Sequence, residues 1–123
     1  MNPDNYGTPK ASQRLVDAGI VLEFEYCWFP DVNSKTGWSL NRCFGKLPSS
    51  DCIPATSMAE VWRELPTTTM LTRVFKDGED RKEGDTIVWD HTKPSHIFFV
   101  RTNPADALID LLIWVVGQRK EKL

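Results

Sequence analysis

The chain has 123 residues and a formal net charge of −2, from 15 basic and 17 acidic side chains. Hydrophobic residues make up 41% and charged residues 26%, a composition that excludes an intrinsically disordered chain and favours one folded domain over residues 1–123. The even charge balance also argues against binding to a nucleic-acid backbone, which depends on clustered Lys and Arg.

The first expected helix follows Thr8. Thr8 is a suitable N-cap, Pro9 fits the first helical position, and Gly19 is suited to the left-handed turn that ends a helix. Ala11 and Leu15 recur at helical spacing and predict the buried side.

Residues 20–29 are expected to form a strand. Its even-numbered positions are apolar and largely aromatic, which predicts that this face points at the core. Glu23 and Glu25 share the opposite face. Two carboxylates two residues apart indicate either a solvated strand face, the commoner outcome, or an acid–base or metal site. A turn then leads to a returning strand over residues 38–44.

A second helix is expected before Pro66. Ser57 and Glu60 have the spacing of a capping box, in which each side chain accepts a hydrogen bond from the other residue's backbone. The apolar stripe of this helix consists of Met58, Val61, Trp62 and Leu65.

Three more strands are expected in the second half of the chain. The segments 70–75, 86–89 and 97–100 are rich in β-branched and aromatic residues and are separated by turn sequences. They predict an antiparallel meander, with the charged segment 76–85 as a solvated loop.

The closing helix begins with Asn103 as cap and Pro104 at the first position, with Asp106 in the first turn. About 13 residues precede Gly117, fewer than the roughly 20 needed to span a bilayer, so a membrane role is not expected. We expect this apolar helix to be the central packing element. The predicted fold is α+β: a mostly antiparallel sheet of about five strands against three helices, in the order α-β-β-α-β-β-β-α.

The three cysteines, Cys27, Cys43 and Cys52, lack the paired spacing of a disulfide framework or a zinc knuckle. The first ten residues have no basic region followed by an apolar run, which predicts no signal peptide. We therefore expect free thiols and a cytoplasmic location.

The residues that suggest catalysis are few. No nucleotide-binding glycine motif occurs, and no cofactor is expected. His91 and His96 flank a short turn and, together with Asp90 or Cys27, would make a metal site, although two surface histidines are the commoner outcome. A hydrolase or nuclease is the alternative function. It would need at least three of the side chains of Glu23, Glu25, Asp90, His91 and His96 to converge in one pocket.

Five tryptophans are unusual in so short a chain. Trp28, Trp62 and Trp114 fall on expected core faces. Exposed aromatic side chains often anchor binding surfaces, so the predicted partner-binding residues are Trp38, Arg42, Trp89 and His91. Trp114, or an uncovered sheet edge, is also a candidate contact for a homodimer.

Three blocks, "TPKASQRLVDAGIVLEFEYCW", "IPATSMAEVWRELP" and "NPADALIDLLIWV", cover about half of the chain. They resemble a pattern in small phage- and prophage-encoded proteins of gut Bacteroidetes and Firmicutes. The resemblance implies a phage origin and a host cytoplasm, and it assigns no catalytic residue. The predicted function is therefore that of a phage-derived accessory protein that binds a host or phage protein without catalysis.

Overall fold

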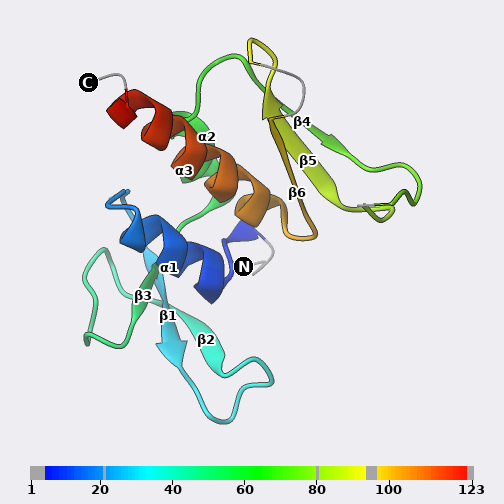
Figure 1. Ribbon diagram of the computed structural model, residues 1–123. Helices are drawn as coiled ribbons and strands as arrows, with labels where there is room; N and C mark the ends of the chain where they lie inside the picture. Colours follow the sequence, from blue (N-terminus) through cyan, green and yellow to red (C-terminus); the bar gives the residue numbers. More distant parts are fainter. Residues whose placement is uncertain (1–4, 21, 80, 94–96, 122–123) are drawn as a thin grey trace.

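The computed structural model describes residues 5–20, 22–79, 81–93 and 97–121 (Figure 1). Its helices and strands make an α+β fold, as the sequence predicts. In chain order they are α1 (Pro9–Asp17), β1 (Tyr26–Pro30), β2 (Trp38–Arg42), β3 (Ile53–Ala55), α2 (Met58–Glu64), β4 (Thr69–Arg73), β5 (Thr86–Asp90), β6 (Phe98–Arg101) and α3 (Pro104–Glu121).

The strands form two sheets, so the prediction of one sheet of about five strands is wrong. The first sheet has the order β2-β1-β3 and the second has the order β4-β5-β6, and all pairs are antiparallel. The predicted meander is confirmed as the second sheet. The sequence analysis missed β3 because this strand has only three residues with Pro54 at its centre. Proline is tolerated there because β3 is an edge strand.

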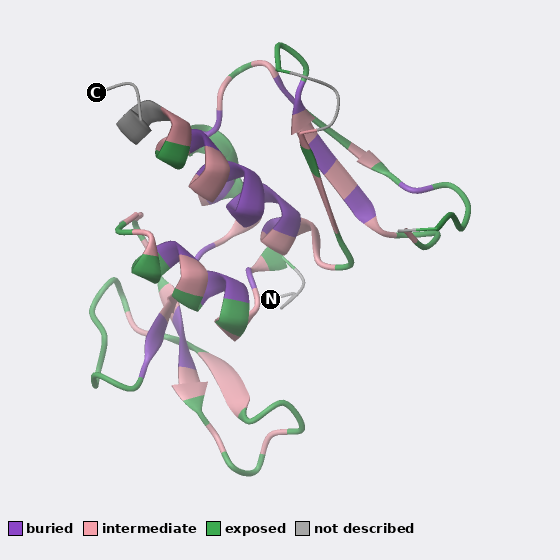
Figure 2. Cartoon of the chain, in the orientation of Figure 1, coloured by how far each residue is buried: buried purple, intermediate pink, exposed green. Residues whose placement is uncertain are grey.

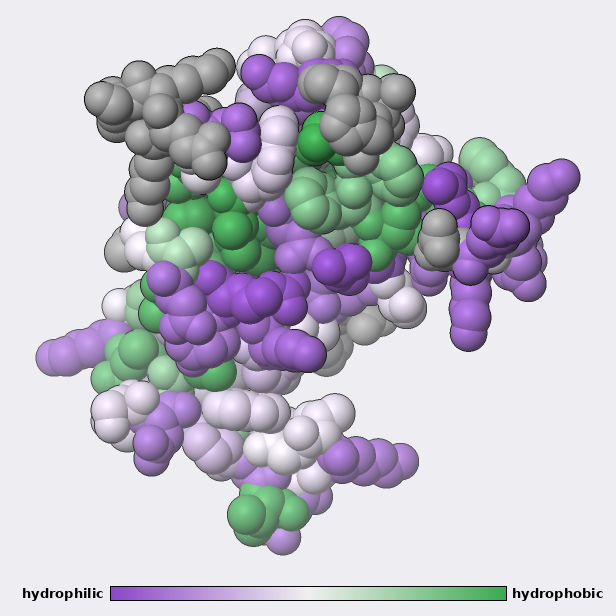
Figure 3. Space-filling model, in the orientation of Figure 1, coloured by the Kyte–Doolittle hydropathy of each residue, from purple (hydrophilic) through white to green (hydrophobic). Residues whose placement is uncertain are grey.

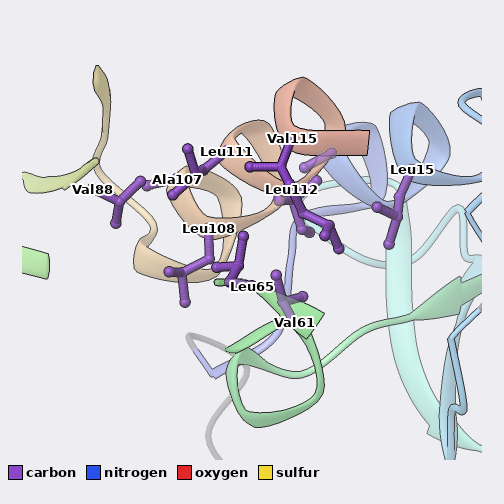
Figure 4. Close-up of a cluster of buried hydrophobic side chains, with 11 residues drawn as sticks. Leu15, Val61, Leu65, Val88, Ala107, Leu108, Leu111, Leu112 and Val115 are labelled. Atoms are coloured by element: carbon purple, nitrogen blue, oxygen red, sulfur yellow. The ribbon is translucent and has the colours of Figure 1, made fainter. Parts of the chain in front are cut away.

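The closing helix lies at the centre of the molecule, as predicted. In Figure 1, α3 lies between α1 and the second sheet, and Figure 2 shows its middle turns buried. Its apolar side chains pack with Leu15 from α1, Val61 from α2, Leu65 directly after α2, and Val88 from β5 (Figure 4). The first sheet joins this core through β3, which packs against α1. Helix α3 is thus the packing element to which both halves of the chain connect.

The ends of α3 differ in how well the sequence predicts them. The Asn103 side-chain oxygen accepts hydrogen bonds from the backbone nitrogens of Ala105 (2.8 Å) and Asp106 (3.2 Å), which confirms the N-cap. The expected end at Gly117 is wrong: Gly117 keeps a helical backbone and the helix continues to Glu121. Even so, no helix in the described ranges is long and apolar enough to cross a membrane.

Two acidic side chains of α3 connect it to neighbouring elements. Asp106 accepts hydrogen bonds from the backbone nitrogen (2.7 Å) and the hydroxyl (2.9 Å) of Thr8, the N-cap of α1. Asp110 is only 8% exposed; it lies 2.7 Å from the guanidinium of Arg14 and 2.8 Å from that of Arg101. A buried carboxylate is tolerated where such partners compensate its charge. Asp110 therefore joins α1, α3 and β6.

Strand β1 is shorter than the predicted strand over residues 20–29. It begins at Tyr26 because its partners, β2 and β3, extend only to that register position. Within it, Cys27 and Trp28 are both buried, so the one-sided burial expected from the alternation is wrong at this point. Trp28 packs in a small second core with Ile53 and Ala55, and its indole donates to the carbonyl of Gly7 (3.0 Å).

Helix α2 confirms its capping box but not all of its predicted stripe. Ser57 and Glu60 cap each other, and Val61 and Leu65 are buried. Trp62 is 47% exposed, so its assignment to the core is wrong. One residue turns an α-helix by about 100°, and Trp62 follows the fully buried Val61 directly, which places it at the side of the short helix.

Candidate functional site

The structure divides the predicted partner-binding residues between the two sheets. Trp38 and Arg42 belong to β2, whereas Trp89 belongs to β5 and His91 follows it. Trp38 packs beside the small core of Trp28, and Arg42 is exposed, pairs with Glu25 and lies over the ring of Phe44. The four residues therefore do not form one continuous surface, and a binding role for either pair stays a prediction.

The carboxylates proposed for catalysis also lie apart. Glu23 and Glu25 are exposed before β1; Glu23 borders a hollow with Glu60 and Glu64. Asp90 borders a different hollow, beside Trp114. His96 lies outside the described residues. Across the described ranges, no group of three or more His, Cys, Asp or Glu side chains is arranged to hold a metal ion.

Asp90 and His91 have clear structural partners. One oxygen of Asp90 accepts hydrogen bonds from the Thr68 hydroxyl (2.6 Å), the Thr92 hydroxyl (2.7 Å) and the Thr92 backbone nitrogen (3.0 Å). The Nδ1 atom of His91 lies 2.9 Å from the carbonyl oxygen of Thr68. These contacts fix the turn after β5 to the segment before β4. Burial alone would raise the pKa of Asp90, but the hydrogen bonds from Thr68 and Thr92 outweigh it and lower the pKa.

This lowered pKa predicts a pH-dependent effect of Asp90→Asn. A carboxyl whose pKa is depressed by folding stabilises the protein above its unfolded pKa of about 3.9, and the contribution is lost as the pH falls through the folded value. The variant should therefore be less stable than the wild type near pH 7, and the difference should shrink by about pH 3. Urea unfolding at both pH values measures it. An equal difference at the two pH values would contradict the assignment.

The three cysteines are free thiols, and those of Cys43 and Cys52 lie near that of Cys27. Cys27 on β1 is fully buried, and burial raises the pKa of its thiol to about 12, with the thiols of Cys43 and Cys52 adding to the rise. A thiol with so high a pKa is a poor nucleophile at neutral pH. The predicted free cysteines are thus present, and Cys27 has the environment of a core residue.

The second sheet carries a candidate binding surface. Val88 is fully buried against α3, so the positions next to it in β5 point away from the helix. Met70 and Phe98 flank Trp89 in the sheet, and they are 46% and 40% exposed. The strand register aligns two rows on this side, which we call the outer face: Met70, Trp89 and Phe98, and Thr72, Ile87 and Val100.

Further aromatic and hydrophobic side chains lie near the outer face. The guanidinium of Arg81 lies over the ring of Phe98, 5.5 Å from its centre, and Phe75 after β4 is also exposed. On the side shown in Figure 3, hydrophobic residues gather in the half formed by α3 and the second sheet, whereas the half with β1–β3 is more hydrophilic. Exposed large hydrophobic side chains of the second sheet and the residues after β4 are thus Met70, Leu71, Phe75 and Phe98.

A second candidate lies at one end of the same sheet. Arg73, Thr86 and Arg101 are direct neighbours on β4, β5 and β6, on the side that faces α3. They border a hollow of about 860 Å³ together with Met58, Leu71 and Asp106. We call this hollow the arginine pocket. The sequence analysis did not identify it because only the pairing of three strands brings these residues together.

The sequence did contain a signal for the outer face. Segments such as "IVW" (87–89) and "IFFV" (97–100) are apolar at consecutive positions. Such runs are typical of strands buried on both faces, whereas a strand with one solvated face alternates. Comparison of the chain with family models, curated proteins and solved structures finds no match.

Proposed function

We propose that this chain is a phage- or prophage-encoded accessory protein that acts in the host cytoplasm by binding another protein, without catalysis. The contact surface in this proposal is the outer face of the second sheet. The phage origin and the location rest on the three resembling sequence blocks. The binding function rests on the structure.

The binding proposal depends on one observation: apolar side chains lie on both faces of the second sheet, but a helix covers only one of these faces. Strands β5 and β6 contain consecutive apolar residues, at 87–89 and 98–100, as strands buried on both faces do, but α3 covers only one face of the sheet. Met70 and Phe98 remain exposed beside Trp89 on the other face. Aromatic and methionine side chains are enriched where proteins bind one another. A partner with an apolar surface would remove these side chains from water, which is favourable.

A photo-crosslinking residue tests where the partner binds. A benzoylphenylalanine at Thr72, on the outer face, should crosslink one host or phage protein in cells. The same residue at Val32, which is 97% exposed in the β1–β2 loop, should not. A crosslink to a second copy of the chain would show that the protein binds itself. Light scattering would then give the mass of a dimer. The absence of a crosslink at Thr72, or the same products from both positions, would contradict the proposal.

The captured partner then allows a quantitative prediction. Phe98→Ala should weaken binding by about tenfold, because truncation of an aromatic anchor commonly costs more than 1 kcal/mol. Val32→Ala is the matched control and should leave the affinity unchanged. Isothermal titration calorimetry measures both. Equal affinity of the Phe98 variant and the wild type would exclude this residue from the contact.

A further inference from the structure

The arginine pocket has polar side chains that converge from three strands. Arg73 and Arg101 each pair with Thr86 in the register of the second sheet, so all three project from the same side. Neighbouring strands are about 4.8 Å apart, which places the two arginine backbones roughly 10 Å apart with Thr86 between them. Two guanidinium groups on either side of a hydroxyl make a suitable set of donors for an anionic group.

Thr86 is the most informative residue of the set. It is only 3% exposed, and it borders the pocket. Within the described ranges its hydroxyl makes no hydrogen bond. Among the described residues, the fully buried side-chain oxygens without a hydrogen-bond partner belong to Thr69 and Asp110. The oxygen of Thr86 is not one of them, because it is reached from the pocket. The hydroxyl of Thr86 is therefore available to a ligand in the pocket.

The charges around the pocket favour an anion. Arg73 makes no ion pair within the described part of the chain, whereas Arg101 lies 2.8 Å from Asp110 and donates to the carbonyl of Val100 (2.8 Å). Asp106 also borders the pocket, but both of its oxygens accept hydrogen bonds from Thr8. Arg73 is therefore the cation at the pocket that has no acidic partner among the described residues.

We propose that the arginine pocket binds a small ligand through an anionic oxygen group, a phosphate or a carboxylate. Arg73, Thr86 and Arg101 would donate to this group. The pocket volume of about 860 Å³ exceeds that of a single ion, and Met58 and Leu71 border it with apolar surface. The ligand therefore has an apolar portion beside its anionic group. This site faces α3, so it is separate from the outer face, and it does not depend on the proposed function.

Three probes test the proposal and separate its two chemical sources. Phenyl phosphate and benzoate share a ring but differ in the anionic group, and inorganic phosphate lacks the ring. Each is titrated at millimolar concentrations, in a buffer without phosphate, while NMR follows the backbone amides of Thr86 and Arg73 and the arginine side chains. We expect one of the two ring-bearing probes to bind more tightly than the other, and phenyl phosphate to bind more tightly than inorganic phosphate if the group is a phosphate.

Matched variants locate the binding. Arg73→Gln should weaken the preferred probe by roughly tenfold, because one charge-assisted hydrogen bond contributes about that factor. Thr86→Val keeps the shape of the side chain; it should also weaken binding, while its melting temperature without ligand stays at or above that of the wild type. Arg63→Gln, on the exposed side of α2, is the control and should bind normally.

Two results would overturn the proposal. One is the absence of binding by all three probes. The other is equal binding by the wild type and the Arg73→Gln variant, which would show a nonspecific effect of the anion. If Thr86→Val fails to fold, the Arg73→Gln variant alone decides.

Discussion

Replacing Leu108 by alanine is expected to lower the free energy of unfolding by about 3 kcal/mol. Leu108 is 1% exposed and lies in the core cluster that α3 forms with α1, α2 and β5. Its truncation removes apolar burial and leaves a cavity that the rigid surrounding elements cannot fill completely. Urea unfolding followed by circular dichroism measures the change.

Val16→Ala is the matched control for this prediction. Val16 lies on α1 but is 44% exposed, so the loss should be under about 1 kcal/mol. A loss at Leu108 no greater than the loss at Val16 would show that α3 is not the centre of the core.

Gly7→Ala is expected to destabilise the protein by about 2 kcal/mol. A methyl group at this position would lie 2.4 Å from the end of the Ile109 side chain and 3.3 Å from the hydroxyl of Ser12. Both neighbours are buried, so neither can move without disturbing the core. The backbone of Gly7 is also fixed, because its nitrogen donates to the carbonyl of Thr56 (3.0 Å).

Gly78→Ala provides the comparison. There the added methyl group would lie 3.3 Å from the Arg81 side chain, near the surface, where a flexible neighbour can move. We expect a change within about 0.5 kcal/mol. Thermal unfolding of the two variants side by side measures the difference, and equal stabilities would contradict the close packing of Gly7 on α3.

Local features of the fold were predictable because they depend on neighbours in the sequence. Thr8, Ser57 and Asn103 each cap the helix that follows them, as their side-chain chemistry predicts. The number of sheets was not predictable, because alternation indicates a strand but not its partners. Strand β3 shows the same limit, since a three-residue strand centred on Pro54 has no local pattern to identify it.

The candidate sites depend still more on strand pairing. Trp89 was identified as a binding residue from its type alone, but its neighbours Met70 and Phe98 become visible only in the register. Arg73 and Arg101 are 28 positions apart in the sequence and meet across β5 for the same reason. The sequence analysis placed all strands in one sheet and therefore grouped four contact residues that the structure divides between two sheets.

The central claim is that α3 joins both sheets in one cooperative unit. Its most direct test is urea unfolding of protein labelled with 5-fluorotryptophan, followed by fluorine NMR. Trp28 reports on the first sheet and Trp89 on the second, and single Trp→Phe variants assign their signals. The shared core predicts that both native signals disappear at the same urea concentration. Separate midpoints, with one sheet still folded while the other is not, would contradict it.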